Sequence, residues 1–229
     1  MKKYNHTSDE NENPFALSIG DLMASLLLIF ILLLASTLIA LKDEYEKKSD
    51  VAERYKQIKQ QIYESLNDEF KEDLKKWNAD IHLKSLTIRF QEPEVLFGTN
   101  QFELTSRFKE ILNNFFPRYI KILSKKEFKN NIEEIRIEGH TDSIGNYYHN
   151  MELSQNRTRS VLKYVLEETE LTLADKEWIQ TNLTANGLSY SKPIYRNDSE
   201  MGRFYNRRVE FRIRTNAENQ IDSMLKIGR

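Results

Sequence analysis

An uninterrupted apolar run near the N-terminus is the strongest pattern in the chain. It extends from Leu22 to Leu41, is 20 residues long and contains no charged residue. At about 1.5 Å of rise per residue, a helix of that length spans about 30 Å, the thickness of the hydrocarbon core of a bilayer. The pattern therefore predicts one transmembrane helix, assigned to residues 15–41, behind a polar tail of residues 1–14. A cleaved signal peptide is the alternative, but the run is long for one and has no clear cleavage site.

Residues 42–80 have a different pattern, in which charged residues flank a narrow apolar stripe. Its apolar positions recur at steps of three and four residues, and neither proline nor glycine interrupts them, which predicts a long helical linker. The stripe comprises Val51, Tyr55, Ile58, Ile62, Leu66, Phe70, Leu74 and Trp77. Either this helix packs on its own domain or two copies pair as a neck. We favour the neck, because a narrow stripe flanked by charges suits paired helices.

Residues 81–216 alternate between strand and helix patterns, which predicts one α/β domain with a mixed sheet. In the last expected strand Val209, Phe211 and Ile213 face one way, and the charged residues between them face the other. The predicted fold class is α+β, with a C-terminal tail at residues 217–229. Strands are expected at residues 83–90, 132–138, 183–188 and 208–214, and helices at residues 105–123, 151–166 and 171–180.

The amino-acid composition excludes several kinds of functional site. The chain has 229 residues, no cysteine and a formal net charge of -1. Disulfides, cysteine zinc sites and thiol nucleophiles are therefore excluded, and the charge balance gives no reason to expect direct nucleic-acid binding. A metal or hydrolytic site at Glu138, His140 and Asp142 is disfavoured because no second histidine falls at ligand spacing. We expect no cofactor and no enzymatic activity, and we interpret the arginines between residues 203 and 214 as a solvated strand face.

Two segments near the C-terminus carry a family resemblance. Residues 137–166 (IEGHTDSIGNYYHNMELSQNRTRSVLKYVL) and 192–213 (KPIYRNDSEMGRFYNRRVEFRI) resemble the OmpA-like peptidoglycan-binding domain of OmpA proteins, Pal lipoproteins and MotB stator subunits. The matching residues are Gly139-His140-Thr141-Asp142, Asn150, Leu153-Ser154, Arg157, Gly202-Arg203 and Asn206-Arg207-Arg208-Val209. His149 and Thr158 depart from the family, which usually has tyrosine and alanine there, but neither change removes a charge.

The resemblance implies an OmpA-like α/β sandwich that binds peptidoglycan. It implies that Asp142 and Arg157 bind the diaminopimelate of the wall peptide. The other site residues implied by the same resemblance are Thr141, Asn150, Leu153 and Asn206. The chemistry agrees with this assignment, because a carboxylate suits the ammonium of diaminopimelate and a guanidinium suits its carboxylate. The alternative is that Asp142 and Arg157 only pair with each other on the surface.

One acid, Asp21, stands at the entrance to the apolar run. A charged side chain costs on the order of 3 kcal/mol at the middle of a bilayer and less near its edge, so such a residue is a candidate for function. Asp21 shares a helical stripe with Ser18, Ser25, Leu28, Leu32 and Ser36. A stripe that gathers the polar groups on one face favours contact with another protein over contact with lipid. The alternative is that Asp21 lies among the lipid headgroups.

An acid near one end of a single membrane helix, followed by a wall-binding domain, resembles the B subunit of ion-driven motors. The run GDLMASLLLIFILLL and the short polar N-terminus resemble the ZorB family of Zorya anti-phage defence systems. This resemblance implies a homodimer inside a pentameric ring of a ZorA- or MotA-like partner. It implies that Asp21 carries the transported ion, a proton or alternatively sodium.

The same resemblance implies a single-pass protein of the cell inner membrane, with a cytoplasmic N-terminus and a periplasmic C-terminal domain. The two lysines before the helix, Lys2 and Lys3, favour that orientation only weakly. We favour the Zorya role. A flagellar MotB-like stator and a passive peptidoglycan tether remain open as alternatives.

Overall fold

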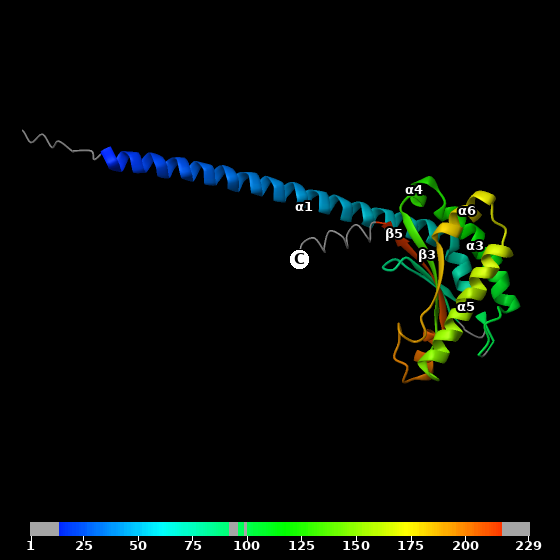
Figure 1. Cartoon of the computed structure of the whole chain (residues 1–229). Coiled ribbons are helices and arrows are strands. Elements are labelled where there is room, and N and C mark those ends of the chain that lie inside the picture. The colour runs from blue at the N-terminus through cyan, green and yellow to red at the C-terminus, as the bar shows by residue number, and fades with distance from the viewer. Residues whose placement is uncertain (1–13, 92–95, 99, 217–229) are drawn as a thin grey trace, which may run out of the picture. The chain divides into compact units, whose positions relative to one another are not determined.

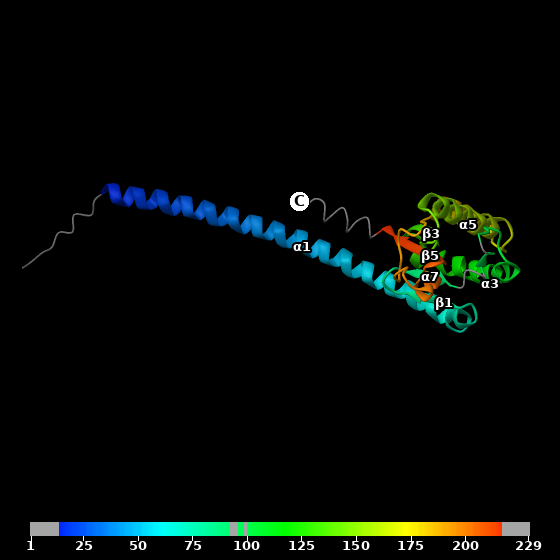
Figure 2. The same cartoon turned by 90° about the horizontal axis from the view of Figure 1, so that it is seen from below.

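The computed structural model describes residues 14–91, 96–98 and 100–216, apart from the side chains of residues 14–18, 47, 48, 51 and 52. The tails expected at residues 1–14 and 217–229 lie outside these ranges, except for Pro14. The chain divides into two units between Asp50 and Val51. Figures 1 and 2 show the chain from two directions.

The first unit contains the N-terminal part of helix α1, which runs from Pro14 to Lys76. Within α1, the segment Ile19–Glu46 is long and apolar enough to cross a membrane, with a mean hydropathy of 2.8. Its large apolar side chains are exposed in this single chain, as in the case of Leu22. The apolar run expected to be helical is therefore helical, and its surface has no cover within the part of the chain that the structure describes.

The second unit is built on a five-stranded mixed sheet, which confirms the predicted α+β class. The strand order is β1-β2-β5-β3-β4. Strand β3 pairs in parallel with β4, and the other neighbouring pairs are antiparallel. The strands are β1 (Ala79–His82), β2 (Thr87–Phe90), β3 (Ile132–His140), β4 (Leu183–Gly187) and β5 (Arg208–Thr215).

The sheet has one apolar face and one charged face, because the two kinds of residue alternate along its central strands. Phe211 of β5 lies between Ile137 of β3 and Ile88 of β2, and all three side chains are buried. On the opposite face Glu138 lies beside Glu210 in the same register. The expected alternation along the last strand is therefore confirmed.

Helices pack on the apolar face and form a single core with it (Figures 1 and 2). They are α3 (Ser106–Leu123), α5 (Tyr147–Glu167) and the last part of α1, with the shorter α4 (Lys126–Lys129), α6 (Leu173–Asn182) and α7 (Glu200–Asn206) in the connections. The Thr105 hydroxyl accepts a hydrogen bond from the Phe108 amide at 3.1 Å. This N-cap explains why α3 begins where the sequence predicted.

The expectation of a neck at the end of α1 is wrong for residues 62–77, because their stripe packs into the core of their own domain. Phe70 is fully buried, and its ring lies 5.3 Å from the ring of Phe115 on α3. Arg118 of α3 donates to Glu69 at 2.7 Å and to Asp73 at 2.8 Å. The periodic stripe correctly indicated a buried face, but the face is covered by α3 and the sheet.

The boundaries of the elements that follow α1 differ from the predicted ones. Helix α1 ends at Lys76, and Asn78, with a φ of 47°, turns the chain into β1, a strand that the sequence did not predict. The strand expected at residues 83–90 is shorter, because Leu86 has a φ of 47° and belongs to the turn between β1 and β2. Helices α4 and α7 were also not predicted.

Two glycines allow α5 to lie unusually close to the sheet. A Cβ added at Gly139 of β3 would lie 2.7 Å from a Thr158 methyl carbon and 2.9 Å from the Ser154 carbonyl oxygen. A Cβ added at Gly187 of β4 would lie 2.3 Å from the backbone nitrogen of Gln155. The first half of α5 is therefore held against the ends of β3 and β4, where the candidate site lies.

Candidate functional site

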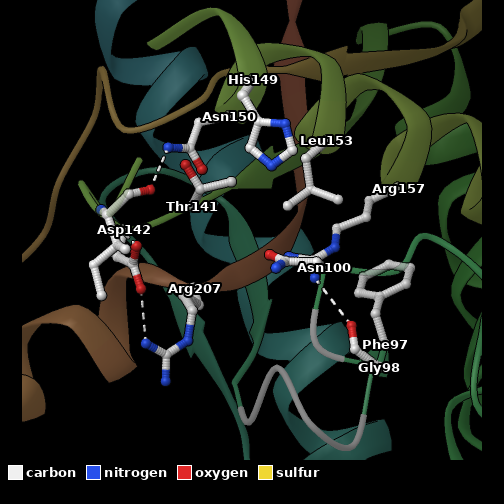
Figure 3. A pocket seen from close by; sticks show the side chains of 11 residues that line it. Phe97, Gly98, Asn100, Thr141, Asp142, His149, Asn150, Leu153, Arg157 and Arg207 are labelled. Carbon is white, nitrogen blue, oxygen red and sulfur yellow. Dashed lines mark hydrogen bonds and ion pairs between the residues drawn. The ribbon is translucent and has the colours of Figure 1, made fainter. Parts of the chain in front are cut away.

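A cavity of about 360 Å³ lies where β3 ends and α5 begins (Figure 3). Its walls come from the loop after β3, the first turns of α5, the segment before α3, and the residue between α7 and β5. The lining residues are Phe97, Gly98, Asn100, Thr141, Asp142, Ile144, His149, Asn150, Leu153, Arg157 and Arg207. The fold thus brings together five of the predicted wall-binding residues, namely Thr141, Asp142, Asn150, Leu153 and Arg157.

Asp142 is held by two hydrogen bonds, one to each carboxylate oxygen. Its Oδ1 accepts from the backbone amide of Ile144 at 2.9 Å, and its Oδ2 accepts from Arg207 at 2.8 Å. The residue is only 7% exposed. Because a carboxylate oxygen can accept two hydrogen bonds, Asp142 keeps capacity for a cationic ligand.

Arg157 lies across the cavity from Asp142, beside Phe97 (Figure 3). Its Nε donates to the Gln101 carbonyl at 2.9 Å, and its guanidinium lies 4.9 Å from the centre of the Phe97 ring. Burial lowers the pKa of Arg157 to about 10, and the charge of Arg207 adds to this effect while Asp142 opposes it. Arg157 is therefore a fixed and largely desolvated cation.

Asp142 and Arg157 do not pair with each other. Within the part of the chain that the structure describes, the ion-pair partner of Asp142 is Arg207. The guanidinium of Arg157 is instead oriented by backbone carbonyls, including that of Gly98 at 3.4 Å. The surface-pair alternative therefore does not describe this site, and both charges are left facing one cavity.

Thr141 and Asn150 have different roles in the cavity. Asn150 is 4% exposed and donates to the Ile144 carbonyl at 2.7 Å, so it holds the loop that contains Asp142. Gly145, with a φ of 87°, provides the sharp turn in that loop. Thr141 is also 4% exposed, and its hydroxyl has no hydrogen-bond partner among the described residues. Since an unpaired buried hydroxyl is costly, a ligand in the cavity would stabilise it.

Asn206, the sixth residue assigned to the site by the resemblance, does not line the cavity. Its side chain is fully buried and accepts from the amides of Ile194 and Tyr195 at 2.8 and 3.1 Å. It also donates to the Tyr195 carbonyl at 2.8 Å. Asn206 therefore fastens the loop after β4 to the start of β5, next to the cavity residue Arg207.

Sequence reasoning missed several lining residues, of which Arg207 is the most important. The motif Asn206-Arg207-Arg208-Val209 was recognised, but its arginines were interpreted as a solvated strand face. Arg208 contradicts that interpretation, because it is 4% exposed. Ile144 and His149 lie within the matching segment 137–166 but were not assigned to the site, and no motif pointed to Phe97, Gly98 or Asn100.

A buried charged cluster lies on the other face of the sheet. His140 lies 3.8 Å from a Glu138 oxygen and 3.9 Å from a Glu210 oxygen, so these three residues could offer ligands to one metal ion. However, Glu210 already accepts from Arg208 at 2.7 Å and from Arg89 at 2.8 Å. Those guanidiniums neutralise the carboxylate and oppose a further cation.

The pKa values of His140 and Glu210 are both lowered, for different reasons. Burial is the largest influence on His140 and lowers its pKa, so the neutral ring is favoured. Burial is the largest influence on Glu210 and by itself would raise its pKa. The charge of Arg208 is the main opposing influence. With the smaller contributions of His140 and Arg89, the pKa of Glu210 is lowered to about 2. The cluster therefore pairs an ionised carboxylate with a histidine that binds a proton less readily than a free imidazole does.

Comparisons with known proteins identify the family. Residues 96–207 match the model of the OmpA family. The Zorya protein ZorB of Escherichia coli (strain Crooks) is 38% identical over 225 residues, which cover 95% of this chain and 94% of that protein. The chain belongs to the ZorB family.

Further similarities agree with this membership. A ZorB from Escherichia coli O139:H28 is 24% identical over 90% of this chain and 82% of its own length. The crystal structure of a MotB-like protein from Desulfovibrio vulgaris is 25% identical, with a TM-score of 0.51, and covers 70% of this chain and 96% of that one. Membership of the ZorB family, together with the OmpA-family domain at residues 96–207, confirms the expected OmpA-like, MotB-like fold and the expectation that the chain is not an enzyme.

Proposed function

We propose that the cavity binds the diaminopimelate of peptidoglycan peptides. This residue carries an ammonium and a carboxylate on one carbon. The ammonium binds Asp142, and the carboxylate binds Arg157 on the opposite wall. Both groups are more than nine-tenths buried, so water competes weakly for their charges. The Thr141 hydroxyl provides a further hydrogen bond to the ligand. The observation that carries this proposal is the placement of one carboxylate and one guanidinium on opposite walls of a single cavity, without a direct pair between them.

We further propose that wall binding anchors a membrane motor. In this proposal the helix assigned to residues 15–41 spans the inner membrane once, the N-terminus is cytoplasmic and the cavity lies in the periplasm. Two copies sit inside a pentameric ring of a ZorA-like partner, which covers the exposed apolar surface of α1. The family membership supports this assembly over the flagellar MotB-like alternative.

Asp21 is the ion carrier in this motor. It lies near the start of an apolar helical segment, and the Ser25 hydroxyl one turn later donates to its backbone carbonyl at 2.8 Å. The transported ion is a proton, with sodium as the alternative. Each proton that crosses the membrane releases about 2.3 kcal/mol per 100 mV. The ring can turn against the dimer only if the dimer is held, which is the task of the wall domain.

The substitution Asp21→Asn separates the motor from a passive tether. It removes the ionisable group and keeps the size of the side chain, and Asp43→Asn, beyond the apolar run, is the matched control. In cells with the complete defence system, we expect Asp21→Asn to abolish protection against phage and the control to retain it. Both variants should co-sediment with purified sacculi as the wild type does. Full protection by Asp21→Asn would contradict the motor and leave the tether.

A further inference from the structure

The charges that face the cavity do not balance. Asp142 contributes one negative charge, while Arg157 and Arg207 contribute two positive charges. The two arginines influence each other, since the charge of Arg207 lowers the pKa of Arg157. The cavity therefore keeps a positive charge that the zwitterionic end of diaminopimelate, whose own charges cancel, does not neutralise.

Arg207 is placed to bind more than Asp142. Its bond to the Asp142 Oδ2, at 2.8 Å, uses one of the five N–H donors of a guanidinium. Its side chain is 28% exposed, and the guanidinium lies 6.0 Å from the centre of the Phe204 ring. In Figure 3 it lies on the Asp142 side of the cavity, away from Arg157. A ligand whose ammonium contacts Asp142 would therefore bring its neighbouring groups close to Arg207.

We propose that Arg207 binds a second carboxylate of the wall peptide, beside the diaminopimelate zwitterion, and so selects peptides in which this carboxylate is not amidated. The inference rests on the proposed binding of diaminopimelate in the same cavity. An ammonium and two carboxylates match one carboxylate and two guanidiniums, which leaves no unpaired charge in the complex. Asp142 would retain its bond to Arg207, because its oxygens can accept additional hydrogen bonds.

Two carboxylates of a wall peptide have the required chemistry. One is the free α-carboxylate of the γ-linked glutamate that precedes diaminopimelate, and the other is the carboxylate at the C-terminal end of the peptide. Synthetic stem tetrapeptides distinguish them. One probe carries both carboxylates, a second has the glutamate α-carboxylate replaced by an amide, and a third has a C-terminal amide.

Calorimetric titration of the full-length chain in nanodiscs measures the affinity for each probe. We expect one amidated probe to bind about tenfold or more weakly than the unmodified peptide, as loss of a charge-assisted hydrogen bond predicts. The Arg207→Gln variant should bind that probe and the unmodified peptide alike, while Arg207→Lys should keep part of the preference. The control Arg196→Gln, at a surface arginine whose side chain is 90% exposed, should behave as the wild type does.

Three outcomes would overturn the inference. Equal binding of all three probes by the wild type shows that no second carboxylate is recognised, and it leaves the proposed function intact. Preserved discrimination in Arg207→Gln, with an unchanged thermal unfolding profile, assigns the preference to another residue. Failure of the wild type to bind the unmodified peptide overturns the inference together with the proposed function.

Discussion

The ring of Phe70, near the end of α1, lies 5.3 Å from the ring of Phe115 on α3, and both side chains are fully buried. Phe115 in turn lies 5.1 Å from Phe211 on the central strand of the sheet. These contacts make the last turns of α1 part of the domain core.

We predict that Phe70→Ala destabilises the domain. Replacement of a fully buried phenylalanine by alanine typically costs about 3–5 kcal/mol in lost burial and in the cavity left behind. Urea unfolding of the full-length protein, followed by tryptophan fluorescence, measures this change through Trp77, which is itself in the core. The neighbouring Lys71→Ala, at an exposed position of the same helix, should leave the stability within about 0.5 kcal/mol of the wild type. A Phe70→Ala domain as stable as the control would show that α1 does not belong to the core.

We predict that acid destabilises the domain in two steps. The folded-state pKa of His140 lies below its ordinary value of 6.5, so the unfolded chain binds that proton first and stability falls as the pH drops below about 6.5. The pKa of Glu210 is lowered from 4.5 to about 2, so its contribution is present above about pH 4.5 and is lost as the pH falls toward 2. That second contribution is about 3 kcal/mol.

Urea unfolding at a series of pH values tests both steps. Glu210→Gln should be less stable than the wild type near neutral pH, because Arg208 loses its buried partner, and its stability should change less below pH 4.5. His140→Gln should remove the step just below pH 6.5. Glu152→Gln, at an exposed position of α5, should retain both steps. Identical pH profiles for all these proteins would exclude the buried cluster as the source of the acid sensitivity.

Much of the fold was predictable because its elements have strong local signals. The apolar alternation of β5 and the Thr105 cap of α3 both agree with the structure. The two glycine contacts explain why the family motif carries the site, since they hold α5 beside the end of β3. Asp142 follows the strand expected at residues 132–138, and Arg157 lies in the helix expected at residues 151–166. Both side chains therefore reach one cavity from elements that the sequence predicted.

Other features depend on tertiary contacts that a single sequence does not reveal. The apolar stripe of α1 showed that one face of the helix is buried, but not what covers it. The sequence therefore could not distinguish a neck between two copies from a contact with the chain's own domain. Arg207 and Arg208 are adjacent, yet the first lines the cavity and the second is buried beside Glu210. Arg207 is the extended residue between the end of α7 at Asn206 and the start of β5 at Arg208, and neighbouring side chains of an extended chain point to opposite sides.

We propose above all that Asp142 and Arg157 together bind the cell wall. Co-sedimentation of the full-length protein with purified sacculi, over a range of protein concentrations, tests this most directly. The variants Asp142→Asn and Arg157→Gln each remove one charge, and Arg159→Gln changes an exposed arginine on the same helix. We predict that each of the first two weakens binding by about tenfold or more, while the Arg159 variant binds as the wild type does. Wild-type affinity in both Asp142→Asn and Arg157→Gln would contradict the account.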